Sequence, residues 1–200
     1  MTNFISLAIF AYLFGSISWG HLIAKIKKVD LTKIGSGSPT GTNVARALGW
    51  RWGMISGILD LLKGVIPTYL ALNYLINDWQ IVTIAFLPTL GHIFPVFFKF
   101  KGGRGASTFF GASLVLFGPK FFFPLFLIWI LIFFITRTAG LTNFIFPWIF
   151  STFLYFYWPG HPLGPYFIFG ISEAILINFA LRNNIKRLIR GEEPKTPLKF

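Results

Sequence analysis

The chain has 200 residues, of which 54% are hydrophobic and only 12% are charged, so it carries too little polar surface to cover a soluble globular protein. A net charge of +12 would suit a nucleic-acid-binding protein, but the apolar bulk favours anionic lipid headgroups or anionic substrates as partners instead. Cysteine is absent, which excludes disulfides, thiolate catalysis and iron–sulfur ligation. The composition therefore predicts an all-α integral membrane protein with a single transmembrane domain over residues 1–200.

Apolar runs between polar interruptions predict about seven transmembrane helices, or five with two partial spans. The first run is expected to remain as a span, because no Lys or Arg precedes it and no small-residue cleavage site closes it. Apart from Lys120, and with Lys63 near the inner end of its helix, all Lys and Arg fall on one side of the membrane. The positive-inside rule then places the N-terminus outside and the C-terminus in the cytoplasm. The predicted spans lie near 4–24, 53–75, 81–98, 106–118, 120–135, 142–158 and 165–181.

Two of the predicted spans are irregular. The third contains Pro88 and Pro95, and the fourth has about 13 residues, or roughly 20 Å of helix, against a hydrocarbon core of about 30 Å. Broken helices at membrane depth are tolerated where they line a water-filled or protein-filled site, so a bent pair around a cavity is one interpretation and a simple proline kink the other. Small residues with the spacing of tight helix contacts, which we interpret as packing, occur at Ser16, Gly20, Gly53 and Gly57.

The segment between the first two predicted spans has the composition of a phosphate-binding loop. Its small residues expose consecutive backbone N–H groups, its hydroxyls add donors, and the guanidinium of Arg46 can grip a phosphate at two points. No Lys follows the last glycine, so it is not a Walker loop, and a merely flexible loop is the alternative. The predicted phosphate-binding residues here are Gly35, Ser36, Gly37, Ser38, Thr42, Asn43 and Arg46.

A second glycine-containing loop, Lys99 to Gly105, leads directly into the predicted fourth span. Its glycines allow the backbone to curl into a cluster of N–H groups, and the following helix N-terminus adds partial positive charge. Positive-inside anchoring with a tight turn is the alternative, but an anchor needs charge and not three glycines. The predicted phosphate-binding residues are Gly102, Gly103 and Gly105, completed by Lys101 and Arg104.

Several polar residues fall within the predicted spans. His92 either orients a substrate or relays a proton, or else forms a hydrogen bond to a neighbouring helix. Asp60 and Lys63, three residues apart on one helix face, are predicted to neutralise each other, with a substrate role as the alternative. Glu173 is a lone acid whose partner the sequence does not indicate. His21 and His161 have weaker claims to a functional role.

The basic segment after the last predicted span begins at Arg182. Basic residues alternate with apolar ones there, as in an interfacial helix attracted to anionic lipid. Asn184 and Arg187, three residues apart, are alternatively predicted to face the same site as the two glycine loops.

Together these motifs resemble the bacterial glycerol-3-phosphate acyltransferases that use acyl phosphate as donor, the PlsY family, over almost the whole chain. The motifs that carry the resemblance are Gly15-Ser16-Ile17 with Gly20; Asp30-Leu31; Gly35-Ser36-Gly37 through Thr42-Asn43-Val44 and Arg46-Ala47-Leu48-Gly49; Leu59-Asp60 with Leu62-Lys63-Gly64; Gly91-His92 with Phe94-Pro95-Val96-Phe97; Phe100-Lys101-Gly102-Gly103 with Gly105; and Asn184-Ile185 with Arg187-Leu188, Gly191 and Glu193.

The resemblance implies seven helices in a bacterial inner membrane, with three signatures meeting on the cytoplasmic side. It implies transfer of a fatty acyl group from acyl phosphate to the 1-hydroxyl of glycerol 3-phosphate, without metal or cofactor. On this basis Ser36, Arg46, Lys101 and Arg104 are the expected catalytic residues. His92, Asn184, Arg187 and the small residues of both loops are the expected binding residues.

The acyltransferases that use acyl-CoA or acyl carrier protein have a His with an Asp five residues later, which none of the three histidines has here. This chain departs from the PlsY pattern at Ser38, Thr40-Gly41, Arg104 and Ala180-Leu181. A divergent relative with another acceptor, or one without catalysis, is therefore an alternative. A small-anion membrane carrier and a non-enzymatic membrane scaffold are the others.

Overall fold

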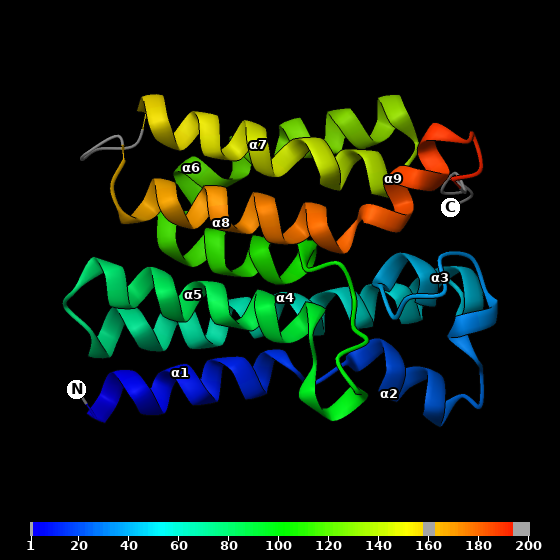
Figure 1. Ribbon diagram of the computed structural model, residues 1–200, viewed down its shortest axis with the longest axis horizontal. Coiled ribbons are helices and arrows are strands. Elements are labelled where there is room, and N and C mark those ends of the chain that lie inside the picture. Colours follow the sequence, from blue (N-terminus) through cyan, green and yellow to red (C-terminus); the bar gives the residue numbers. More distant parts are fainter. Residues whose placement is uncertain (1, 158–162, 194–200) are drawn as a thin grey trace. The chain divides into compact units, whose positions relative to one another are not determined.

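The computed structural model describes residues 2–157 and 163–193, and every regular element in these ranges is a helix (Figure 1). The predicted turn at 158–162, with His161, lies outside the described residues. The elements are α1 (Thr2–Gly15), α2 (Trp19–Ile26), η1 (Leu31–Lys33), α3 (Gly41–Leu48), α4 (Trp50–Tyr74), α5 (Asp78–Ile93), η2 (Val96–Phe98), α6 (Ala106–Thr136), α7 (Ala139–Tyr157), α8 (Pro165–Ala180) and α9 (Arg182–Ile189).

Five helical segments in the described ranges are long and apolar enough to cross a membrane. The pair Pro165–Ala180 and Arg182–Ile189, bent by 61°, is a sixth candidate. The predicted boundary between the fourth and fifth spans coincides with a break inside α6, because Gly118 is non-helical with φ 71° and ψ 165° and is followed by Pro119. The two separate spans on either side of it stay a prediction. The five segments are Asn3–Ile26, Trp50–Tyr74, Asp78–Phe98, Ala106–Thr136 and Ala139–Tyr157.

The chain divides into two compact units, Met1–Leu116 and Phe117–Phe200. In the first unit α1 packs against α4 and α5, and the short helix α3 packs against α4 (Figure 1). The predicted packing role of the small residues is confirmed at Gly20 and Gly53, whereas a Cβ on Gly57 would meet nothing within 4 Å. A Cβ on Gly20 would overlap the backbone of Pro39, and one on Gly53 would overlap Ala45 and Gly41.

Two helices in the first unit differ from the sequence prediction. The predicted first span agrees with the membrane-length segment Asn3–Ile26 but contains an unpredicted break, because α1 ends at Gly15 and α2 begins at Trp19. The predicted loop over residues 25–52 contains the helix α3, whose first turn is capped by the hydroxyl of Thr40, which accepts from the backbone N–H of Asn43 at 3.3 Å. Thr42, Asn43 and Arg46 therefore lie on a helix and not in a loop.

In the second unit α7 packs against α8 and α9 (Figure 1). Part of α6 carries a ladder of stacked rings, in which successive ring centroids lie 5.5, 5.6 and 5.5 Å apart. The indole N–H of Trp129 in this ladder donates to the side-chain oxygen of Asn143 on α7 at 2.8 Å. The ladder consists of Phe122, Phe126, Trp129 and Phe133.

Candidate active site

The first glycine loop is held in shape by one buried side chain, Asn43. Its side-chain oxygen accepts from the backbone N–H of Ser36 at 3.2 Å, and its amide nitrogen donates to the carbonyl oxygen of Leu31 at 3.3 Å. Gly35 and Gly37 have φ values of 50° and 68°, in the region that favours glycine. Asn43 thus uses both polar groups of its side chain inside the loop, so its direct contact with a phosphate stays a prediction.

Other predicted residues of the first loop come together around Gly35. A Cβ on Gly35 would touch the side chains of Asn43 and Arg46, so the guanidinium arm lies along this glycine. The hydroxyl oxygen of Ser36 is buried and has no hydrogen-bond partner among the described residues. Ser38 is buried nearby in the chain, and Thr42 is half-buried in the first turn of α3. The guanidinium of Arg46 therefore lies next to Gly35, and the adjacent hydroxyl of Ser36 makes no hydrogen bond among the described residues.

Positive charge precedes this loop in the chain. Lys25, Lys27 and Lys28 are exposed at the end of α2, and the ammonium of Lys27 lies 4.3 Å from the centroid of the Trp52 ring. Asp30 is the acid of this segment, and the hydroxyl and N–H of Thr32 lower its pKa by donating hydrogen bonds to the carboxylate. The setting attracts anions, as the charge distribution of the sequence predicts.

The second loop folds back on the end of α5. Lys99 and Phe100 have left-handed φ values of 53° and 59°, and the backbone N–H of Gly103 donates to the carbonyl oxygen of His92 at 3.1 Å. Gly105 has φ 85°, and its carbonyl accepts the first hydrogen bond of α6, from Phe109 at 2.9 Å. The loop therefore opens directly onto the N-terminus of α6, where unpaired N–H groups favour an anion.

The charged side chains of the second loop differ in exposure. Lys101 is exposed, whereas Arg104 is half-buried. Gly102 lies against the carbonyl oxygen of His92, and Gly103 lies against its imidazole ring, so neither position has room for a Cβ. Steric fit against His92, and not only chain flexibility, thus explains two of the three glycines.

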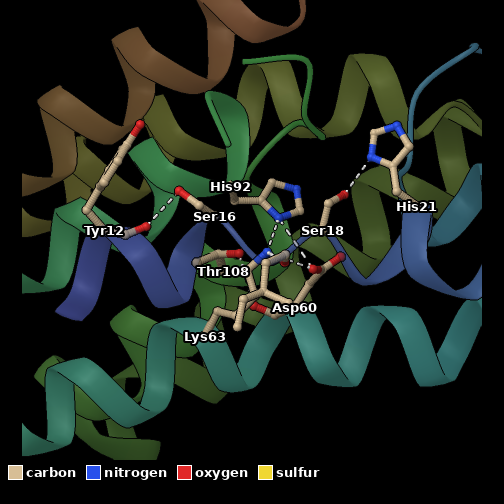
Figure 2. A network of polar contacts seen from close by, with 9 residues as sticks. Tyr12, Ser16, Ser18, His21, Asp60, Lys63, His92 and Thr108 are labelled. Atoms are coloured by element: carbon tan, nitrogen blue, oxygen red, sulfur yellow. Dashed lines mark hydrogen bonds and ion pairs between the residues drawn. The ribbon is translucent and has the colours of Figure 1, made fainter. Parts of the chain in front are cut away.

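Beneath the second loop lies a buried polar network that joins α4 and α5 (Figure 2). The ammonium nitrogen of Lys63 lies 3.0 Å from a carboxylate oxygen of Asp60 and 2.8 Å from Nδ1 of His92. It also donates to the carbonyl oxygen of Ile17 at 2.9 Å, in the break between α1 and α2. Thr108 of α6 donates from its hydroxyl to the backbone carbonyl of Asp60 at 3.0 Å.

This network confirms one sequence prediction and extends another. Asp60 and Lys63 pair with each other, as their spacing predicts. His92 forms the hydrogen bond to a neighbouring helix that was one of its two predicted roles, while its contact with substrate stays a prediction. The third partner of Lys63, the carbonyl of Ile17, was missed, because nothing in the sequence marks the break in the first span.

The two loops are both anchored on α2. Gly20 packs against Pro39, which ends the first loop, and the next residue, His21, stacks on Phe98 just before the second loop. The centroids of the His21 and Phe98 rings lie 4.8 Å apart, and Nδ1 of His21 is 2.9 Å from the hydroxyl of Ser18. One short helix therefore holds both glycine loops at consecutive positions.

The predicted residues of the second unit form a cluster of their own on α9. Asn184 and Arg187 both donate to the carboxylate of Glu193, at 2.6 and 2.9 Å. Gly191, with φ 71°, turns the chain back after α9, and a Cβ on Gly140 would touch the same carboxylate. The sequence analysis did not predict this contact with Glu193. The prediction that Asn184 and Arg187 face the same site as the two glycine loops stays a prediction.

Two departures from the family pattern fall at the junction of α8 and α9. Ala180 is 3% exposed and Leu181 is 1% exposed, so both apolar side chains occupy buried positions.

Among residues 2–157 and 163–193, no group of three or more His, Cys, Asp or Glu side chains is placed to hold a metal ion.

Comparison with known proteins connects this arrangement to a family. A family model described as glycerol-3-phosphate acyltransferase matches residues 5–191. The chain belongs to that family. The glycerol-3-phosphate acyltransferase of Aquifex aeolicus is 40% identical over 94% of this chain and 96% of its own, and that of Thermus thermophilus is 36% identical over 96% and 95%.

Solved structures agree with the family assignment. The crystal structure of PlsY, an integral membrane glycerol 3-phosphate acyltransferase, in its glycerol 3-phosphate form matches with a TM-score of 0.90 at 38% identity, over 98% of this chain and 96% of that one. The lysophosphatidic acid form matches with a TM-score of 0.86, over 96% and 95%. This PlsY family member is thus a multi-pass membrane protein, and its loops belong to an acyltransferase scaffold.

Proposed function

We propose that this protein transfers a fatty acyl group from acyl phosphate to the 1-hydroxyl of glycerol 3-phosphate, giving lysophosphatidic acid and inorganic phosphate. The observation that carries the proposal is the anchoring of two glycine loops on the consecutive residues Gly20 and His21 of α2. Each loop combines backbone N–H groups, basic side chains and the start of a helix, as a phosphate site requires. Two phosphate sites side by side suit a reaction in which both substrates carry a phosphate.

In this reaction the hydroxyl oxygen attacks the carbonyl carbon of acyl phosphate. The new C–O ester bond forms, the bond from carbon to the phosphate oxygen breaks, and phosphate leaves with that electron pair. A substrate phosphate accepts the hydroxyl proton, so no strongly basic side chain is needed. Positioning and charge stabilisation then carry the catalysis.

The proposed residue roles follow the two loops and α9. Ser36 from the first loop and Arg46 from α3, with Lys101 and Arg104 from the second loop, hold the phosphates and stabilise the oxyanion that forms at the carbonyl. The unengaged hydroxyl of Ser36 supports this role. Asn184 and Arg187 help to bind glycerol 3-phosphate.

The same proposal covers topology and location. We place seven spans in one transmembrane domain, counting the two parts of α6 on either side of Gly118 separately and α8 as the last. The N-terminus is outside, and the loops and C-terminus face the cytoplasm, because nearly all Lys and Arg then lie inside. The named relatives are bacterial proteins, which supports the bacterial inner membrane as the location.

The proposal is tested with purified protein in lipid vesicles that are given glycerol 3-phosphate and one acyl donor at a time. We expect lysophosphatidic acid, measured by mass spectrometry, with palmitoyl phosphate but not with palmitoyl-CoA or palmitoyl acyl carrier protein. Product only with a thioester donor would contradict the proposed donor. Uptake of labelled glycerol 3-phosphate into the vesicles without acyl product would show a carrier instead.

A further inference from the structure

His21 lies where α2 meets the segment that leads into the second loop. Its imidazole stacks on the ring of Phe98 in η2, with the ring centroids 4.8 Å apart and the ring planes 9° from parallel. A centroid distance of about 4.5 to 7 Å is typical of a stabilising aromatic pair. His21 had only a weak claim to a role from the sequence, because nothing there links it to Phe98. The contact exists only in the folded chain.

Ser18 fixes the orientation of the His21 ring. It directly precedes the first residue of α2, a position where a serine hydroxyl ordinarily caps the helix by accepting from a backbone N–H. The hydroxyl makes no such cap here and instead lies 2.9 Å from Nδ1 of His21 (Figure 2). Ser18 is 4% exposed, so water has little access to this hydrogen bond. Ser18 and Phe98 thus act together on one ring and set its plane.

Phe98 connects this stack to a basic residue of the second loop. Its carbonyl oxygen accepts from the backbone N–H of Lys101 at 3.0 Å, and its own N–H donates to the carbonyl oxygen of Pro95 at 3.1 Å. The N–H of Phe100 donates to the same carbonyl at 3.0 Å. Residues 95–101 therefore form one hydrogen-bonded turn, so that a shift of Phe98 moves Lys101 with it.

The helix that carries His21 is held in place independently of the second loop. Just before α2, the carbonyl oxygen of Ile17 accepts from Lys63 of α4 at 2.9 Å. At the next turn, Gly20 lies directly against Pro39 at the end of the first loop, with no room for a Cβ. Because His21 follows Gly20, its place relative to the first loop is set by this contact.

We propose that His21 is a positioning residue for acyl transfer: oriented by Ser18, its ring holds Phe98 and thereby sets the place of Lys101 relative to the first loop. This inference rests on the proposed function and deepens it, because it names what aligns the two phosphate sites. Alignment matters because the attacking hydroxyl and the acyl carbonyl belong to different molecules, and a small misplacement of reacting atoms costs a large factor in rate. His21 itself needs no contact with either substrate.

A space-filling role for His21 predicts different behaviour. If the side chain only fills the gap between α2 and η2, leucine replaces it about as well as phenylalanine does. If the face of the ring holds Phe98, phenylalanine retains function and leucine does not. Ser18 provides a second distinction, because its hydroxyl can bond to a histidine ring but not to a phenylalanine ring.

The first experiment measures kcat/KM for acyl transfer in vesicles with His21→Phe, His21→Leu and Ser18→Ala. We expect His21→Leu to lower it about three-fold to ten-fold, the range of one lost aromatic pair, and His21→Phe to stay within about two-fold. Ser18→Ala should lower it alone but not when combined with His21→Phe. Ile26→Ala, at the exposed end of α2, is the matched control. Equal values for the Phe and Leu variants, or an equal cost of Ser18→Ala in both backgrounds, would overturn the proposal.

A second measurement does not depend on turnover. The chain has no cysteine, so a nitroxide spin label can be attached at Lys99→Cys alone, an exposed position next to Phe98. We expect its electron paramagnetic resonance spectrum to show a more mobile label with leucine at position 21 than with histidine or phenylalanine. A label at Lys33→Cys, just before the first loop, should not respond. Equal mobility at position 99 in all three proteins would overturn the proposal. If acyl transfer is absent while the label responds as expected, the proposed reaction fails and the positioning of the second loop by His21 stands.

Discussion

The two glycine loops look alike in sequence, yet they are held in different ways. The first is held by a neighbour in the chain, because Asn43 bonds back to Ser36 and Leu31 across 7 and 12 residues. The second is held by side chains from two other helices, with His92 of α5 bonded across 29 residues to Lys63 of α4. One loop thus has a local neutral support, and the other a buried charged one.

This difference has a physical consequence. The support of the first loop consists of two neutral hydrogen bonds, each of which contributes about 1 kcal/mol. The support of the second loop needs an ion pair buried in a membrane protein, which is stable only while Asp60, Lys63 and their acceptors are all in place. We therefore expect the second loop to be the less tolerant of changes beneath it.

The largest effect is expected from Arg46, the charged side chain of α3 that lies against Gly35 of the first loop. Arg46→Ala should lower the rate of acyl transfer by about 100-fold to 1,000-fold, the usual cost of one oxyanion-stabilising donor. Arg51→Ala is the matched control, because Arg51 is exposed at the start of α4. Initial rates in vesicles check this, and equal rates for the two variants would remove Arg46 from the site.

The next largest effect tests the fit of the second loop on His92. Gly103→Ala should lower the rate about ten-fold to 100-fold, because its Cβ would meet the imidazole ring. Combining it with His92→Asn should cost less than the product of the two single effects, since the shorter side chain makes room. Gly57→Ala is the control, as a Cβ there meets nothing within 4 Å. Strictly multiplicative effects would contradict this packing.

The local support of the first loop should give a smaller effect. Asn43→Ala leaves the N–H of Ser36 and the carbonyl of Leu31 without their partner, a cost of about 1–3 kcal/mol. We expect a lower melting temperature and about a ten-fold rise in KM for a phosphate-bearing substrate. Asn73→Ala, at an exposed position, should change neither value. Unchanged KM in Asn43→Ala would separate the shape of this loop from substrate binding.

The smallest effect on rate is expected in the second unit. Glu193→Gln keeps the shape of the side chain but removes the charge that Arg187 contacts at 2.9 Å. Because neither glycine loop changes, the rate should fall only a few-fold, in keeping with about 1 kcal/mol for one weakened charged contact. Glu192→Gln, exposed and adjacent, is the control. A loss as large as that of Arg46→Ala would place the decisive anion contacts on α9 instead.

The local features were the ones that the sequence could predict. The break at Gly118 follows from a glycine next to a proline, and the Asp60–Lys63 pair follows from helical spacing. The support of the first loop was partly visible, since Asn43 stands within the glycine-rich segment. Its position on a helix capped by Thr40 was missed, because that helix has only eight residues.

The features that escaped prediction depend on distant contacts. No proline marks the break between α1 and α2. The carbonyl oxygen of Ile17 in this break accepts a hydrogen bond from Lys63, 46 residues away. The ring of His92 under Gly103 depends on how α5 packs on α4, which hydrophobic spacing does not encode. Glu193 could have been suggested by Gly191, since a glycine after a helix turns the chain back toward it.

The most direct test of the central claim is growth of a bacterial strain that lacks its own acyl-phosphate-dependent glycerol-3-phosphate acyltransferase. The strain is given either this protein or its Arg46→Ala variant, and the amount of each in the membrane is measured. We predict growth with the unsubstituted protein and none with Arg46→Ala at equal membrane amounts. Absence of growth with the unsubstituted protein present in the membrane, or equal growth with both, would contradict the account.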